Sequence, residues 1–239
     1  MKTITCAVCF AAAAVCLNAQ RPVQEFHTNK GVVKITPIRH ASMLIEAGGK
    51  NIYIDPAQGS LDGLPQADII LITDIHGDHM APPMISKLEN KKTLIIGPKA
   101  VAATVTNIEV MNNGESKTVG DWTIDAVPMY NIKRKSPDGK LYHDKGRGNG
   151  YVLTYGGMRF YISGDTEGIP EMRALKNIDV AFVCMNLPYT MTPEEAADAV
   201  KEFHPKIVYP YHYGKSDLQV FKKALEGTGI DVRLVDWYY

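Results

Sequence analysis

Residues 74–79 have the sequence DIHGDH and directly follow an apolar run at residues 69–72 (IILI). The apolar run predicts a buried strand. A strand that ends in such a cluster delivers carboxylates and imidazoles to the rim of a sheet. Four of the six residues are potential metal ligands: Asp74, His76, Asp78 and His79. We expect Gly77 to let the backbone turn tightly enough for these side chains to converge. The stretch therefore predicts a metal site at the edge of a sheet.

The composition is that of a neutral globular protein. The chain has 239 residues, of which 45% are hydrophobic and 22% are charged, and its formal net charge is zero. Because a neutral chain offers no broad positive face to a phosphate backbone, we expect no nucleic-acid partner. No apolar run after residue 20 is long enough to cross a bilayer, so we expect no transmembrane segment. These observations leave the oligomeric state open.

The first 19 residues have the organisation of a secretory signal peptide. Lys2 is followed by an apolar stretch at residues 6–17, and the small residue Ala19 precedes a polar segment. We therefore expect cleavage after Ala19 and export, either to the periplasm or as a secreted protein. A lipid anchor on Cys16 is the less favoured alternative, because Val15 fits poorly in the position before such a cysteine.

The cysteines indicate neither a disulfide framework nor a thiol nucleophile. Removal of the signal peptide would leave only Cys184, so the mature chain would have no internal disulfide. Cys184 ends the apolar run VAFVC at residues 180–184, which favours a small buried core residue over a catalytic thiol.

Residues 20–239 predict one domain built of short strands and helices. The helix beginning at Thr192 has a capping box with Glu195, and Ser216 is expected to open the last helix. Strands are expected at residues 32–38, 42–47, 51–54, 69–73, 93–96, 117–119, 123–127, 151–155, 159–162, 180–184, 207–211 and 231–234. Further helices are expected at residues 82–88, 98–104 and 216–226. Two strand-rich halves, each edged by helices, predict an α/β fold: a four-layer αββα sandwich of two facing mixed sheets.

Three further candidate ligands lie later in the chain. His143 precedes Gly146, Asp165 lies in the sequence SGDT, and His212 lies in the sequence YHYG. Asp165 and His212 each follow an apolar strand, so the sheet would hold them rigidly. A two-metal centre needs about three protein ligands for each ion. The three residues supply the ligands that the DIHGDH stretch lacks.

This arrangement resembles the metallo-β-lactamase superfamily over nearly all of the mature chain. The H-x-H-x-D-H signature of that family matches residues 74–79, with Asp74 where the first histidine is usual. Within the superfamily, the chain is most similar to the branch that contains L-ascorbate-6-phosphate lactonase-type hydrolases. The matching segments are residues 40–46, 52–56, 126–131, 164–166, 169–172, 189–192 and 212–214. The resemblance implies two divalent metal ions, with zinc as the first choice and manganese or iron as alternatives.

The resemblance also assigns each candidate ligand to an ion. Three residues would bind the first metal: Asp74, His76 and His143. Three would bind the second metal: Asp78, His79 and His212. Asp165 would bridge the two ions. The sequence around His143 matches the corresponding family segment only loosely.

Asp74 changes the expected charge of the centre. Three carboxylates and one hydroxide would neutralise two divalent ions, whereas the usual pattern leaves one positive charge. A less positive core is a weaker Lewis acid, and an added oxygen ligand favours manganese or iron over zinc. The alternative is that Asp74 turns away and leaves the first site weak or empty.

Five further residues are candidates for the pocket or for supporting the ligands: His40, Asp55, Asn131, Tyr189 and Tyr213. His40 would orient the site or serve as a structural histidine. Asp55, before a proline, would hold a ligand histidine, with an Asx-type turn as the plain alternative. The tyrosines would line the pocket, where a phenol can stabilise an oxyanion, or pack in its rim.

The segment at residues 131–149 lacks strong periodicity and is rich in basic side chains. Its basic residues are Lys133, Arg134, Lys135, Lys140, Lys145 and Arg147, against two aspartates. The segment is either a solvated loop or a basic lip beside the metals, which would attract an anionic small-molecule substrate.

We expect a metal-dependent hydrolase in which a metal-bound hydroxide attacks an ester or lactone carbonyl. Asp78 and His76 are the expected catalytic residues, with Asp78 steering the nucleophile or accepting its proton. One alternative is a phosphodiesterase similar to N-acyl-phosphatidylethanolamine phospholipase D. The other is a non-catalytic binding protein that has lost a working first metal site, which the presence of Asp74 favours.

Overall fold

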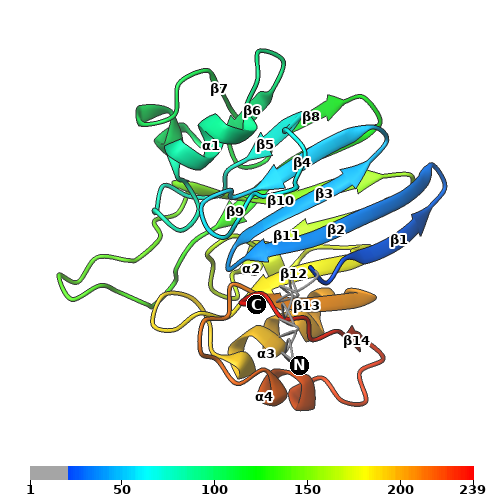
Figure 1. Ribbon diagram of the computed structural model, residues 1–239. Coiled ribbons are helices and arrows are strands. Elements are labelled where there is room, and N and C mark those ends of the chain that lie inside the picture. Colours follow the sequence, from blue (N-terminus) through cyan, green and yellow to red (C-terminus); the bar gives the residue numbers. More distant parts are fainter. Residues whose placement is uncertain (1–20) are drawn as a thin grey trace, which may run out of the picture.

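The computed structural model describes residues 21–239, and its strands form two mixed sheets of seven (Figure 1). The predicted signal peptide and its cleavage site lie outside the described residues and stay a prediction. The strands of the first sheet, in spatial order, are β1 (Gln24–Thr28), β2 (Gly31–Arg39), β3 (Ser42–Ala47), β4 (Lys50–Ile54), β5 (Ile69–Leu71), β6 (Leu94–Gly97) and β7 (Ile108–Val110).

The second sheet repeats this plan in the later half of the chain. Its strands are β8 (Ser116–Val119), β9 (Trp122–Met129), β10 (Gly148–Tyr155), β11 (Met158–Ile162), β12 (Val180–Cys184), β13 (Ile207–Tyr211) and β14 (Asp231–Val232). In each sheet the first four strands pair antiparallel and the last four pair parallel. The two halves of the chain therefore form similar sheets.

Helices lie on the outer faces of the two sheets, which gives the four-layer αββα sandwich predicted from the sequence (Figure 1). The helical elements are α1 (Pro82–Leu88), η1 (Lys99–Ala103), α2 (Pro170–Arg173), α3 (Pro193–Phe203) and α4 (Leu218–Ala224). Ile85 and Leu88 of α1 pack in a buried apolar cluster with side chains of the first sheet. None of the helices in residues 21–239 is long and apolar enough to span a membrane.

The larger core fills the space between the sheets and continues beneath α3. Trp122, Tyr151, Phe160 and Phe182 are fully or almost fully buried there. Cys184 is also buried in this core, as predicted. The free energy of apolar burial in this layer fixes the two sheets against each other.

Most predicted elements are found within a few residues of their expected bounds, and the differences have local causes. The segment predicted as a helix at 98–104 forms the 3₁₀ helix η1. The last helix begins after Asp217, whose carboxylate accepts from Gln219 N, because the Ser216 hydroxyl bonds to Met185 O instead. Three short elements were not predicted, namely β1, β7 and α2, because each has only three to five residues and little periodicity.

Parallel strand direction brings the predicted ligands to one edge of the sandwich. The DIHGDH stretch follows β5, His143 follows β9, Asp165 follows β11 and His212 follows β13. The carboxyl ends of parallel strands meet at a common edge, where side chains of separate segments converge. Across the sheets, Asn149 N donates to Thr73 O at 2.9 Å, which joins the two ligand-bearing edges.

Candidate metal centre

Six of the seven predicted ligands form two neighbouring groups at this edge, and Asp78 forms a third group with His212 and His40. The first ligand cluster is Asp74, His76 and His143, and the second ligand cluster is His79, Asp165 and His212. Within each cluster, one potential ligand atom from every residue lies within 4.8 Å of the others. Asp78 lies beside the second cluster, where its carboxylate is 3.2 Å from His212 Nε2 and 4.0 Å from His79 Nε2. All seven predicted ligands are therefore brought together.

Asp165 lies between the two clusters. Its Oδ2 is 3.2 Å from His143 Nε2 in the first cluster and 3.3 Å from His79 Nε2 in the second. Its Oδ1 is 3.6 Å from His212 Nδ1. A carboxylate in this position can bind ions on both sides of it.

The second cluster contains polar atoms that the protein leaves without hydrogen bonds. His79 Nε2, Asp165 Oδ1 and His212 Nδ1 are buried and have no hydrogen-bond partner. Buried polar atoms are nearly always paired, because an unpaired one costs about 1–3 kcal/mol. Two imidazole nitrogens and a carboxylate oxygen are a donor set that suits a divalent ion such as zinc. The residues present therefore fit a bound metal.

His79 is held from behind by Asp55, which follows β4. The His79 Nδ1–H group donates to Asp55 Oδ2 at 2.7 Å, and Thr73 donates to both oxygens of Asp55, at 2.7 Å from its N and 2.6 Å from its Oγ1. These bonds fix the orientation of the His79 ring, with Nδ1 toward Asp55 and Nε2 toward Asp165. Asp55 thus occupies the place that a carboxylate takes behind a metal-binding histidine.

His143 is held in the same manner by Asn131. Asn131 Oδ1 accepts from His143 Nδ1 at 2.6 Å and from His143 N at 2.8 Å, while Asn131 Nδ2 donates to Tyr189 O. His143 Nε2 is therefore the free nitrogen, and it faces Asp165. Asn131 was among the residues expected to line the pocket or support a ligand, and the structure places it on His143.

The first cluster has a cationic neighbour, Arg147. Asp74 Oδ1 accepts from Arg147 Nε at 3.2 Å, and Asp74 Oδ2 accepts from Arg147 Nη2 at 3.1 Å. Asp74 Oδ2 is also 2.7 Å from His76 Nδ1 and 3.8 Å from His143 Nε2. Asp74 is fully buried and does not turn away from the cluster.

His40 and Tyr238 lie behind Asp78. His40 Nε2 and His212 Nε2 are each 3.2 Å from Asp78 Oδ2. His40 Nδ1 is 2.6 Å from Tyr238 Oη, which in turn accepts from Gly214 N. Tyr238 carries no sequence signal for this contact, since it belongs to the C-terminal segment beyond the last strand.

The carboxylates in and beside the second cluster favour positive charge at its histidines. Burial alone would lower the pKa of His79, but the Asp165 and Asp55 carboxylates raise that pKa well above its ordinary value. Burial would likewise raise the pKa of Asp165, but His212, His79 and His143 hold that pKa well below its ordinary value. In the absence of metal, a proton on His79 would supply positive charge that a divalent ion supplies when bound.

One side of the centre is open to solvent. The side chains of His76 and Asp78 are 42% and 33% exposed, whereas His79, His143 and His212 are buried. A substrate would therefore approach over His76 and Asp78. Tyr189 is partly exposed and packs its ring against Tyr142, while the Tyr213 hydroxyl accepts from Trp237 N and is used by the C-terminal segment.

The expected role of Gly77 was wrong, and another glycine is needed instead. The backbone of Gly77 is not left-handed, and a Cβ there would meet no atom within 4 Å. The turn is closed by bonds from His79 N and Met80 N to His76 O, which any residue at position 77 allows. Gly164 has φ of +60°, and a Cβ there would lie 2.6 Å from Met129 Sδ. Gly164 therefore lets the chain reach Asp165.

The loop between β9 and β10 is less cationic than its composition indicated. Lys133 pairs with Glu195, Arg134 with Glu167 and Glu195, Lys140 with Asp138, Lys145 with Glu171 and Arg147 with Asp74. With five of its six basic side chains paired, the loop offers less free positive charge than the predicted basic lip required.

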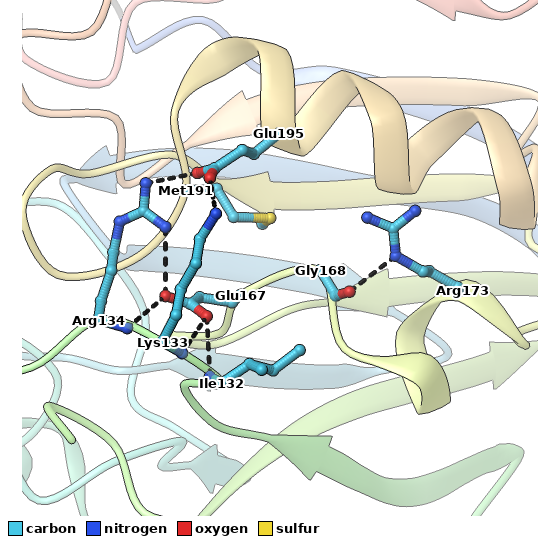
Figure 2. A pocket seen from close by; sticks show the side chains of 8 residues that line it. All are labelled: Ile132, Lys133, Arg134, Glu167, Gly168, Arg173, Met191 and Glu195. Carbon is cyan, nitrogen blue, oxygen red and sulfur yellow. Dashed lines mark hydrogen bonds and ion pairs between the residues drawn. The ribbon is translucent and has the colours of Figure 1, made fainter.

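Figure 2 shows how the start of this loop is anchored beside a cavity of about 170 Å³. The backbone N–H groups of Ile132, Lys133 and Arg134 all donate to the Glu167 carboxylate, at 2.8 to 2.9 Å. Glu195 at the start of α3 binds the Lys133 and Arg134 side chains. None of the predicted metal ligands lines this cavity. The network ties the loop that carries His143 to the second sheet.

Replacing Glu195 with Gln is expected to lower the free energy of unfolding by about 1–2 kcal/mol at pH 7. Although burial opposes it, bonds from Lys133, Thr192 N and Arg134 lower the pKa of Glu195 to about 2. A carboxyl with a lowered folded-state pKa stabilises the fold above its unfolded pKa of 4.5, and the stabilisation is lost as pH falls toward 2. Urea unfolding should therefore show a gap between the two proteins at pH 7 that narrows at pH 3. Glu194→Gln, an exposed neighbour on α3, serves as the control. A gap that is equal at both pH values would contradict the pairing.

The fold and the site together define a class of protein: an αββα sandwich with a histidine- and aspartate-lined metal centre at one edge. Comparisons with known proteins agree with this class. A family model described as the β-lactamase superfamily domain matches residues 34–212. UPF0173 metal-dependent hydrolases from Methanopyrus kandleri and Thermococcus onnurineus are 31% and 34% identical to this chain. The alignments cover 85% and 81% of this chain and 96% and 92% of those relatives.

A solved structure extends the agreement. The crystal structure described as a metal-dependent hydrolase from Parabacteroides distasonis has a TM-score of 0.87 and 41% sequence identity, and the match covers 92% of this chain and 100% of that one. The chain therefore belongs to the metallo-β-lactamase superfamily. It is a metal-dependent hydrolase, like the relatives that share this fold over almost their whole length.

Proposed function

We propose that this hydrolase cleaves an ester or lactone bond of a small molecule, using two divalent ions held by the two ligand clusters. The position of Asp165 carries the proposal. One oxygen of its carboxylate lies 3.2 Å from His143 Nε2 and 3.3 Å from His79 Nε2, so it would serve ions held by either cluster. The histidine-rich donor set suits zinc, with manganese or iron as alternatives.

Some residues of the centre would bind the ions, and others would act on the water or the substrate. Bound ions would supply an acidified water and positive charge to stabilise a developing oxyanion. Asp78, partly exposed and fixed by His40 and His212, is placed to orient that water or to accept its proton. His76 lies on the same open side and would hold the first ion where substrate arrives.

The choice of ester or lactone rests on the segments that resemble lactonase-type hydrolases, such as residues 40–46 and 52–56. Within them, His40 supports Asp78 and Asp55 supports His79. The paired charges of the loop between β9 and β10 give little support to an anionic substrate or a phosphodiester. We therefore propose ester or lactone hydrolysis alone, and the assay below also tests for phosphodiesterase activity.

Purified protein should hydrolyse members of a lactone and aryl-ester panel more than about tenfold faster than bis-aryl phosphates. Removal of metal by a chelator should abolish this activity, and zinc, manganese or iron should restore it, because the attacking water depends on the ions. Turnover should be followed by pH-stat for lactones and by absorbance for aryl substrates. Turnover of bis-aryl phosphate without turnover of any ester or lactone would overturn the proposal.

A further inference from the structure

We infer that Arg147 is a charge-compensating partner of Asp74, and that the two residues together replace one neutral ligand of the first metal ion. This inference rests on the proposed two-ion function and concerns the first ligand cluster alone. In the sequence, Arg147 is one of six basic residues in the segment 131–149. The structure places it in a bidentate pair with the residue at the altered signature position.

The contacts show that the pair is built into the site. The Asp74 side chain is fully buried and the Arg147 side chain is only 19% exposed. Arg147 Nη2 also donates to Tyr142 O at 2.9 Å, and Arg147 N donates to Asp144 O, so both its side chain and its backbone are fixed next to His143. A planar guanidinium held on both oxygens of a carboxylate keeps its charge and its geometry.

The charge balance follows from these contacts. Asp74 adds one negative charge to a position where the family pattern has a neutral histidine, and the Arg147 guanidinium adds one positive charge directly behind it. The total charge of the centre therefore equals that of the histidine pattern. Asp74 Oδ2 remains 2.7 Å from His76 Nδ1 and 3.8 Å from His143 Nε2, so it can still bind the ion that those histidines bind. Arg147 thus removes the reason to expect a weaker Lewis acid.

The pairing makes a prediction about metal affinity that needs no substrate. If Arg147 compensates Asp74, then Asp74→His alone leaves a buried cation without its partner beside a divalent ion. Repulsion by the Arg147 guanidinium should weaken binding of Co²⁺ at the first ligand cluster by about 10–100-fold. Adding Arg147→Gln removes the repulsion and should restore affinity to within a few fold of the parent. Adding Arg147→Lys keeps the charge and should leave affinity low.

Titration with Co²⁺, followed by its visible absorption and by elemental analysis, measures these affinities. Arg147→Gln and Arg147→Lys both shorten the side chain, but only Lys keeps the positive charge. Comparing them in the Asp74→His background therefore separates the effect of charge from the effect of lost packing. Thermal unfolding of each metal-free variant checks that it folds. We expect the parent and the Gln double variant to bind Co²⁺ with similar affinity. Both should bind it more tightly than Asp74→His and the Lys double variant do. Equal affinities for the Gln and Lys double variants, or an Asp74→His variant as tight as the parent, would overturn the inference.

The same titration separates this inference from the proposed function. A parent protein that binds two ions and shows the expected order, but hydrolyses no ester or lactone, would refute the substrate and leave the pairing intact. A parent that binds two ions without the expected order would refute the pairing alone. A parent that binds only one ion would refute both.

Discussion

Asp165→Asn is expected to release one of the two proposed ions and to lower kcat/KM by about a thousandfold or more. The carboxylate of Asp165 lies between the clusters and faces His143, His79 and His212 together. An asparagine has a single neutral carbonyl oxygen and cannot bind two cations. Loss of the second ion removes about 4 kcal/mol of transition-state stabilisation, which corresponds to that fall in rate.

Elemental analysis and steady-state kinetics on an ester or lactone found in the panel would measure both effects. Asp62→Asn is the matched control, because Asp62 is an exposed aspartate that belongs to neither ligand cluster and whose backbone bonds to Arg21 and Ser60. The control should keep both ions and full activity. If Asp165→Asn retained two tightly held ions and activity within about tenfold of the parent, the proposal that Asp165 serves both ions would be wrong.

The fold was predictable because short apolar runs between turn residues coincide with the strands that form. Segments such as 42–47, 180–184 and 207–211 coincide with β3, β12 and β13 to the residue. Short elements escaped prediction because their stability comes from neighbours. β7 has only three residues, and it forms because β6 offers it a parallel edge.

The candidate ligands were predictable because metal binding requires particular residue types, and most of them directly follow a strand. The residues that support them were harder to find. Arg147 and Tyr238 are ordinary residue types in segments without periodicity, and only the tertiary fold brings them to the site. Thr73 lies in a predicted strand, but nothing in the sequence marks its bond to His79. Most of the loop charges, which composition alone presents as free, are paired with acidic side chains of the loop and of the second half of the chain, and Arg147 alone pairs with the first half, at Asp74.

The structure also explains why residues of unusual backbone conformation cluster here. His40, Asp55 and His212 all have positive φ, between 45° and 58°. Each directly follows the strand that positions it, so the turn into the left-handed region swings the side chain toward the centre. Such conformations cost of order 1–3 kcal/mol each and persist where surrounding bonds hold them. Aspartate and histidine tolerate this region better than most residues.

Asp55→Asn is expected to weaken the second metal site by about 10–100-fold without removing any ligand. The Asp55 carboxylate accepts from His79 Nδ1 and from Thr73 at its two oxygens. The asparagine Nδ2 group cannot accept. In one amide orientation the Thr73 N–H group loses its acceptor, and in the other the His79 Nδ1–H group and the Thr73 hydroxyl both lose theirs. In the second orientation the imidazole is free to rotate away from Asp165. Since asparagine readily adopts positive φ, the backbone itself should not change.

The same substitution should lower the free energy of unfolding of the metal-free protein by about 2–4 kcal/mol, because it leaves a buried donor unsatisfied and breaks a buried pair. Urea unfolding in the presence of chelator measures this effect, and Co²⁺ titration measures the affinity. Asp62→Asn again serves as the control and should change neither. A variant with normal stability and normal affinity for both ions would show that His79 is held by the packing around it, and that Asp55 only shapes the turn after β4.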